Sequence, residues 1–341
     1  MMERRTFFLA LSGLAGCTSS KKPRLNIYNW SDYIGKDTIA NFEREFGVET
    51  RYGVYENNEE MLAKVFGGNS GWDVAFPSNY FIGPMRESRL LTEIDRTLLP
   101  NLGNLDPMLA APEWDPQLNH SVPYMWGATG IVFDTKKRGK LTSWADLWNP
   151  KLKGRLTMLD DPADTVGAAL KKLGHSINSA DAAQLQAAKA ELIRQKPLVR
   201  AYLNAEARDQ LISGDLEAAQ LWGTTSQQAI EAAPHLGFVY PSEGFARYAD
   251  SAVILRESRR PELAHKFIDY LLRPAVAAAI VQFSKTATAN GAARQQLPDR
   301  VRNNPVLYPP PEVLARAEWF VPLPPAAQRL RDRYWTEIKS A

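Results

Sequence analysis

The sequence contains few of the side chains on which metal centres and disulfide frameworks depend. Among its 341 residues there are one cysteine, Cys17, and four histidines, which do not form a His-Glu-x-x-His arrangement. A single cysteine cannot form a disulfide within the chain, and isolated histidines are ordinarily surface or satisfied polar residues. We therefore expect no disulfide scaffold, no metal site and no cofactor.

The short motifs that bind nucleotides or activate a serine are also missing. There is no Gly-x-Ser-x-Gly elbow and no phosphate-binding loop. One acidic cluster, Asp160-Asp161-Pro162-Ala163-Asp164, matches the D-D-x-x-D pattern of magnesium-dependent prenyl-transferring enzymes. That chemistry requires carboxylates on successive turns of one helix, and Pro162 fits only a first turn, so Asp160 and Asp161 precede the helix. We expect a protein that is not an enzyme, and a magnesium-dependent enzyme is the least favoured alternative.

Charge of one sign is scarce as well. The 41 Lys and Arg residues nearly balance the 38 Asp and Glu residues, which gives a net charge of +3, and the basic residues are spread along the chain. This distribution argues against a nucleic-acid partner. It also means that any attraction for a cationic ligand has to come from carboxylates gathered in a cleft. The length suffices for two domains, and 45% hydrophobic with 23% charged residues is an ordinary globular composition.

The N-terminus has the layout of an export signal. Arg4 and Arg5 precede a short apolar run at residues 7–11, and small residues follow directly before Cys17. The apolar run is too short to remain as a membrane-spanning helix. The alternative is a buried N-terminal helix that carries an incidental cysteine.

The segment before Cys17 resembles a bacterial lipobox, in which the cysteine is lipidated and becomes the mature N-terminus. Residues 1–23 are thus predicted to be a lipoprotein signal peptide and a polar tether, with cleavage before Cys17. Arg4 and Arg5 also resemble a twin-arginine export signal. These features predict an exported protein, periplasmic or on the cell surface, that is anchored to the membrane through a lipid on Cys17.

Strand-like and helix-like segments alternate along the rest of the chain. This alternation favours an α/β fold, with sheets flanked by helices on both faces, and it implies two sheets. The predicted strands are residues 25–29, 48–54, 72–76, 128–133, 155–159, 217–221 and 251–255. The predicted helices are residues 37–46, 57–66, 162–173, 180–195, 204–212 and 261–272.

Carboxylates and aromatic side chains gather at the ends of these predicted strands. Ligands of open α/β sheets lie outside the carboxyl ends of the strands, so residues there are expected to share one cleft if the two sheets face each other. The residues just past a strand end are Asp32, Ser78, Tyr80, Asp161, Asp164 and Trp222. Tyr248 and Asp250 directly precede the strand at 251–255, where the chain is expected to pass between the domains.

This combination suits an alkyl amine that carries several positive charges. A carboxylate accepts charge-assisted hydrogen bonds from an ammonium group, and an aromatic face attracts the cation and covers the methylene chain beside it. Structural roles remain open for the same residues. Asp161 could simply cap a helix, Asp32 a turn, and Trp222 could be a core residue.

The chain resembles the spermidine/putrescine-binding proteins that serve bacterial ABC transporters. The strings that carry this resemblance are Tyr28-Asn29-Trp30-Ser31-Asp32-Tyr33, Tyr55-Glu56-Asn57-Asn58-Glu59, Pro77-Ser78-Asn79-Tyr80, Val122-Pro123-Tyr124-Met125-Trp126-Gly127-Ala128-Thr129, Thr142-Ser143-Trp144-Ala145-Asp146-Leu147-Trp148, Asp160-Asp161 and Tyr270-Leu271-Leu272-Arg273-Pro274. The resemblance implies a two-lobed type II periplasmic-binding-protein fold, in which each lobe is a mixed sheet flanked by helices and the ligand cleft lies between the lobes. The expected lobes are residues 24–129 plus 251–297 and residues 130–250 plus 298–341.

The resemblance also implies a ligand site and partners. Carried over by position, the site consists of Trp30, Ser31, Asp32, Tyr33, Ser78, Tyr80, Asp161, Asp164, Trp222, Tyr248 and Asp250. The aromatic residues are expected to wall the methylene chain of a polyamine, and the aspartates to receive its amines. The implied partners are the permease subunits of an ABC transporter, and we expect a monomer.

Several positions depart from the family pattern. Arg247 stands where an aromatic residue is common, Thr286 where a tyrosine contributes a hydroxyl, and Phe320 where spermidine-type members have a glutamine. Thr225 occupies a position that is acidic in putrescine-type members, which slightly favours spermidine. A cation near the site, at Arg247 or Lys285, would instead suit another ligand, such as an amino-acid-like solute or a different amine.

Overall fold

The computed structural model describes residues 22–341, and the predicted leader with Cys17 lies outside the described residues. The strands are β1 (Arg24–Trp30), β2 (Glu49–Tyr55), β3 (Val74–Ala75), β4 (Val122–Asp134), β5 (Leu156–Met158), β6 (Val199–Tyr202), β7 (Ala218–Trp222), β8 (Leu236–Val239), β9 (Phe245–Ile254), β10 (Ala287–Thr288) and β11 (Ala317–Trp319). The helices are α1 (Thr38–Phe46), α2 (Asn58–Val65), α3 (Asn79–Glu87), α4 (Thr135–Arg138), α5 (Pro162–Lys172), α6 (Ala182–Gln195), α7 (Ala207–Ile212), α8 (Gly223–Ala232), α9 (Pro261–Leu271), α10 (Pro274–Ser284), α11 (Gly291–Gln295), α12 (Asp299–Arg302), α13 (Pro311–Leu314) and α14 (Pro325–Ser340).

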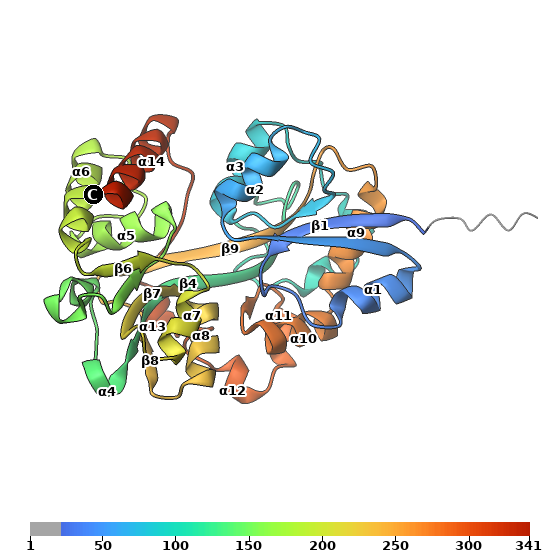
Figure 1. The fold of residues 1–341 in the computed structure, drawn as a ribbon. Helices are drawn as coiled ribbons and strands as arrows, with labels where there is room; N and C mark the ends of the chain where they lie inside the picture. Colours follow the sequence, from blue (N-terminus) through green and yellow to red (C-terminus); the bar gives the residue numbers. More distant parts are fainter. Residues whose placement is uncertain (1–21) are drawn as a thin grey trace, which may run out of the picture.

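Two long antiparallel strands, β4 and β9, join the two halves of the molecule (Figure 1). The main strand order is β2-β1-β3-β9-β4-β7-β5-β6, so the two predicted sheets are halves of one path that share these strands. The prediction placed a strand at 128–133, which is only the second half of β4. The first half of β4 was not predicted because it contains Pro123, and proline is unfavourable within a strand since it has no N–H to donate. Pro123 lies at a register shift in the pairing of β4 with β9.

The first half-sheet is covered by helices on both faces. Residues of β1 alternate between the faces, as the period of a strand requires. Leu25 and Ile27 pack in a cluster with Phe42 of α1 and Phe267 of α9. Tyr28 packs in a separate cluster with residues of α2 and α3. Figure 1 shows these helices on the two sides of β1.

The second half-sheet is built around β7, which lies between β4 and β5. Helices α5, α6 and α14 pack together through Leu170, Leu192 and Trp335, and α7 and α8 contribute Leu211 and Ala229 to a cluster with β7. The C-terminal helix α14 thus completes the second half, beside α5 and α6 (Figure 1). The two-lobed α/β fold is the one that the sequence predicted.

The lobe boundaries at 129/130, 250/251 and 297/298 stay a prediction. Val301, Leu307 and Tyr308, which that prediction assigns to the second lobe, pack in the core cluster of the first half. We therefore propose that the last crossing between the lobes lies closer to residue 309 than to residue 298.

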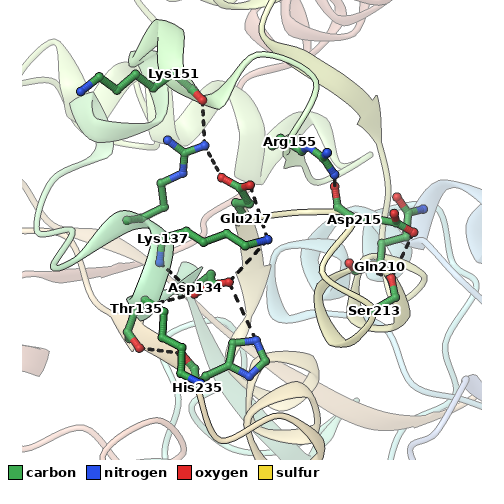
Figure 2. Close-up of polar contacts among 12 residues, drawn as sticks. Asp134, Thr135, Lys137, Lys151, Arg155, Gln210, Ser213, Asp215, Glu217 and His235 are labelled. Atoms are coloured by element: carbon green, nitrogen blue, oxygen red, sulfur yellow. Dashed lines mark hydrogen bonds and ion pairs between the residues drawn. The ribbon is translucent and has the colours of Figure 1, made fainter.

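A polar cluster at the outer end of the second half is structural (Figure 2). Asp134 ends β4, and its side chain accepts the backbone N–H groups of Lys136 and Lys137, which caps α4. Its other oxygen lies 3.9 Å from both Lys137 and His235. Across residues 22–341, the structure contains no group of three His, Cys, Asp or Glu side chains arranged to hold a metal ion.

In the same range, no single helix is long and apolar enough to cross a membrane. Only α9 and α10 taken together reach that length and composition, and they are bent by 73° at their junction.

Candidate functional site

A pocket lies between the two halves and is lined by residues from both of them. The structure brings every one of the residues predicted for the ligand site to the lining of this pocket: Trp30, Ser31, Asp32, Tyr33, Ser78, Tyr80, Asp161, Asp164, Trp222, Tyr248 and Asp250. They come from the ends of β1 and β7, the starts of α3 and α5, and the middle of β9.

Asp250 is almost completely buried on the floor of the pocket. It was predicted to precede a strand, and this is wrong, because β9 begins five residues earlier, at Phe245. Since side chains alternate along a strand, Tyr248 and Asp250 share one face and both point into the pocket. One carboxylate oxygen of Asp250 accepts a 2.6 Å hydrogen bond from Ser78 Oγ, and the other accepts a 2.9 Å bond from the Tyr33 hydroxyl.

Burial raises the pKa of Asp250 to about 7, even though the hydrogen bonds from Ser78 and Tyr33 oppose the shift. The ionised carboxylate is therefore costly in the ligand-free pocket. A cation that enters the pocket would remove this cost.

Asp164 lies on the opposite side of the pocket, in the first turn of α5. Its Oδ1 accepts a 2.6 Å bond from the Thr129 hydroxyl, and its Oδ2 accepts a 2.9 Å bond from Trp222 Nε1. Burial, and next the charge of Asp161, raise the pKa of Asp164 to about 7. The tryptophan thus orients a carboxylate in addition to walling the pocket.

Asp161 has the capping role that the sequence left open. Its Oδ1 accepts the backbone N–H groups of Ala163 and Asp164, at 2.8 and 2.9 Å, with Pro162 at the first helical position. Its side chain nevertheless lines the pocket and is buried, and this burial raises its pKa. Capping uses one oxygen, so the second oxygen remains available to a ligand.

Aromatic rings wall the pocket on several sides. Trp30 donates from Nε1 to the carbonyl of Phe76 at 2.8 Å, which fixes its ring at the end of β1. Tyr80 packs against Phe320 with their ring centroids 5.2 Å apart. Tyr248 faces Gly127 of β4, where an added Cβ would lie 2.6 Å from the Tyr248 hydroxyl, so glycine is needed at that position.

Ser31 and Asp32 form the rim of the pocket beyond β1. The Ser31 hydroxyl donates to Glu56 at 3.0 Å. Asp32 has a backbone φ of 55°, in the left-handed region, and its carboxylate lies 3.2 Å from Arg208 Nη1. Its side chain is 56% exposed, in contrast to the buried Asp161, Asp164 and Asp250.

The pocket also contains Thr225 and Phe320, which were noted as departures from the family pattern, and residues that were not predicted for the site: Glu56, Asn58, Ala205, Thr224 and Gln228. Asn58 is the most informative of them. Its amide donates to Ser78 Oγ at 3.0 Å and to the Tyr80 hydroxyl at 3.3 Å, and it accepts the N–H of Ser78. Asn58 opens α2 directly after the cap residue Asn57, so local sequence indicated only a helix start.

The cations suspected near the site do not line the pocket. Arg247 lies on the opposite face of β9 from Tyr248, and its guanidinium stacks over Trp319 at 4.0 Å from the ring centroid. Lys285 pairs with Glu231 at 3.2 Å. Neither cation is therefore placed to receive a ligand carboxylate in the pocket.

The arrangement can bind a ligand that carries positive charge. Within residues 22–341, no cationic side chain makes an ion pair with Asp161, Asp164 or Asp250, whose hydrogen bonds come from hydroxyl, indole and backbone donors. Buried carboxylates without a cation are unfavourable unless they are protonated or a ligand supplies the charge.

Comparisons with known proteins agree with this geometry. Residues 70–310 match the family described as "Bacterial extracellular solute-binding protein". The spermidine/putrescine-binding periplasmic protein of Escherichia coli K12 is 33% identical over 96% of this chain and 95% of its own length. A solved structure from Listeria monocytogenes, assigned as a spermidine/putrescine ABC transporter, superimposes with a TM-score of 0.90 at 30% identity, covering 93% of this chain and 98% of the other.

A lipoprotein of Treponema pallidum has a similar structure, with a TM-score of 0.84 at 27% identity, and it covers 93% of this chain and 100% of its own. The family match spans most of the chain, and the relatives align over nearly their full length. The chain therefore belongs to the bacterial extracellular solute-binding proteins, which are transport receptors and not enzymes.

Proposed function

We propose that this protein binds a polyamine, spermidine or putrescine, and delivers it to the permease of an ABC transporter. The observation that carries the proposal is the set of three buried carboxylates, Asp161, Asp164 and Asp250, that face one aromatic-walled pocket and have no ion-pair partner among residues 22–341. The similar proteins that are described as spermidine/putrescine-binding or as spermidine/putrescine transporters support a polyamine ligand.

The predicted site residues divide into three roles in this proposal. Asp164 and Asp250 lie on opposite sides of the pocket and receive amines at different positions along the ligand, and Asp161 assists Asp164. Trp30, Tyr80, Trp222 and Tyr248 cover the methylene groups between the amines. The remaining residues, Ser31, Asp32, Tyr33 and Ser78, orient carboxylates or line the rim.

Spermidine is slightly favoured over putrescine. Thr225, which stands where putrescine-type members are expected to have an acidic residue, is buried in the pocket lining. The pocket also holds Glu56 near the rim, which offers a further acceptor to a third amine.

Isothermal titration calorimetry and thermal-shift assays test this function. Spermidine and putrescine should bind and raise the melting temperature, whereas 1,4-butanediol, which has the length of putrescine without its charges, should not. Absence of binding by every polyamine would contradict the proposal.

The alternative of an amino-acid-like ligand has lost its main support, because Arg247 stacks on Trp319 away from the pocket. Stabilisation by amino acids and not by polyamines in the same assay would restore it. The magnesium-dependent alternative fails on geometry, since Asp161 caps α5 and Asp160 pairs with Lys339.

We further propose that lipid on Cys17 anchors the body to the outer face of a membrane and that the receptor acts as a monomer. The similar lipoprotein of Treponema pallidum supports the anchor. Replacement of Cys17 by serine should move the protein from the membrane fraction to the soluble fraction. Replacement of Arg4 and Arg5 by lysine tests twin-arginine export, because that route requires the arginine pair.

A further inference from the structure

Arg208 connects the two halves of the molecule at the rim of the pocket. It extends from α7, and its Nη1 lies 3.2 Å from Oδ2 of Asp32, which follows β1 in the other half. The same Nη1 donates a 2.8 Å hydrogen bond to the side chain of Gln228 on α8. Gln228 in turn donates from Nε2 to the carbonyl of Ser284 at the end of α10, also at 2.8 Å. Two polar contacts, Arg208 with Asp32 and Gln228 with Ser284, therefore connect the two halves at the rim.

A second ion pair lies beside this cluster. Lys285, the residue after Ser284, pairs with Glu231 of α8 at 3.2 Å. Asp32 and Lys285 are two of four non-glycine residues with a positive φ among residues 22–341, at 55° and 61°. At Lys285 the end of α10 accounts for the conformation, because left-handed residues are common directly after a helix. Asp32 follows a strand and not a helix, so no helix end accounts for its positive φ. The contact between its carboxylate and Arg208 holds the backbone in this unfavourable conformation.

The contact with Arg208 changes the expected role of Asp32. A ligand ammonium next to Asp32 would also lie close to the guanidinium group of Arg208, and these two positive charges would repel each other. The exposed Asp32 is already paired with a cation, whereas Asp161, Asp164 and Asp250 are buried and make no ion pair with any of residues 22–341. The charged groups at the rim therefore pair with each other, whereas the carboxylates inside the pocket are available to a ligand.

We propose that Arg208 is a positioning residue that, with Asp32 and Gln228, holds the two lobes closed over bound ligand, so that Asp32 does not receive an amine. The proposal rests on the proposed polyamine function. These contacts exist only when the two halves are close together, so they favour the closed arrangement and increase the ligand affinity of the protein. Exposed ion pairs contribute little individually, so the expected effect of breaking this one is roughly a two- to fivefold loss of affinity.

The first test is a double-mutant cycle with D32N, R208Q and the double variant, in which the affinity for spermidine and putrescine is measured by calorimetry. Both single variants should bind more weakly by similar factors, and the double variant no more weakly than either. The control is R200Q, because Arg200 is exposed and its side chain makes one hydrogen bond within residues 22–341, to the backbone carbonyl of Asp215. Tighter polyamine binding by R208Q, together with a much larger loss in D32N, would overturn the proposal and assign Asp32 to an amine.

The second test does not depend on the ligand. Spin labels at V54C and I193C, two exposed positions in different halves, would report the distance between the lobes in a C17S background without other cysteines. R208Q should shift the ligand-free distribution toward longer distances, and an unchanged distribution would overturn the proposal. If the wild-type protein binds no polyamine, the proposed function fails, and this distance measurement still tests the role of Arg208.

Discussion

Tyr33 and Asp250 are 217 residues apart in the sequence, and their side chains are joined by a 2.9 Å hydrogen bond in the buried pocket. The tyrosine hydroxyl and Ser78 Oγ are the two donors to a carboxylate whose pKa burial raises to about 7. The protein thus keeps an acidic group in an environment where its charge is unfavourable until a cation arrives. The stability of the empty pocket and its ability to bind a cation therefore oppose each other.

Asp250 and Asp164 are the two carboxylates proposed to receive the amines of the ligand. D250N and D164N should each weaken polyamine binding by about 2–5 kcal/mol, or roughly 30-fold to several thousand-fold, because a buried ammonium group would lose its ionic partner. The fold should persist, because Ser78, Tyr33 and Thr129 donate through hydroxyls that can rotate to accommodate an amide. Calorimetry measures the loss. D299N, at an exposed aspartate on α12, is the control that should bind normally.

The same substitutions should stabilise the ligand-free protein, most of all at alkaline pH. Asp164 and Asp250 have a pKa of about 7 in the folded protein, whereas an aspartate in the unfolded chain has a pKa of about 4. Each protonated carboxyl group therefore stabilises the folded protein below about pH 4, and this stabilisation is lost as the pH rises through about 7. The difference in melting temperature between D250N and the wild type should therefore grow between pH 4 and pH 7 and then level off. A constant difference across this range would show that Asp250 is not destabilised by burial.

Ligand affinity should have the opposite dependence on pH. Polyamine amines remain charged below pH 8, whereas Asp164 and Asp250 become protonated below about pH 7 and must lose those protons on binding. Affinity should fall as the pH decreases from 8 to 5.5, by up to about tenfold per pH unit for each proton displaced. Titrations in two buffers with different ionisation enthalpies count the protons released. No release near pH 6.5 would refute the coupling.

Removal of the Tyr33 hydroxyl isolates the hydrogen bond to Asp250. Y33F should reduce polyamine affinity by about 1.5–3 kcal/mol, the usual worth of a hydrogen bond to a charged group, and should move the pH midpoint of binding upward. Y202F is a matched control, because the Tyr202 hydroxyl is buried without a partner and lies outside the pocket. Equal pH profiles for Y33F and the wild type would exclude the orienting role of Tyr33.

Gly127 tests the position of the Tyr248 ring. In G127A the new Cβ would lie 2.6 Å from the Tyr248 hydroxyl, so the ring has to move from its place in the pocket wall. We expect weaker polyamine binding and a lower melting temperature, with a cost of about 1–3 kcal/mol that is typical of overpacking. G103A, where an added Cβ meets no atom within 4 Å, should behave like the wild type.

Local sequence was sufficient for the local structure around Asp161 and Asp164. Pro162 marks a helix start after the predicted strand at 155–159, and α5 begins at Pro162 with Asp161 as its cap. Asp250 was assigned to the pocket but to the wrong local structure, since β9 continues through Phe245, Tyr248 and Asp250 without a break that the sequence reveals.

Other parts of the site depend on contacts between distant segments. Phe320 enters the pocket from a loop before α14, and its carbonyl accepts a 2.6 Å bond from Asn79, 241 residues earlier. Arg208 faces Asp32 across 176 residues. No local pattern marks such partners, because the fold as a whole brings them together.

The most direct test of the account is a crystal structure of the protein with spermidine bound. We predict that ligand nitrogens lie within about 3.2 Å of carboxylate oxygens of Asp164 and Asp250, with methylene groups packed against Trp222 and Tyr248. Amines paired only with Asp32 and Glu56 at the rim, while Asp164 and Asp250 remain without a cation, would contradict it.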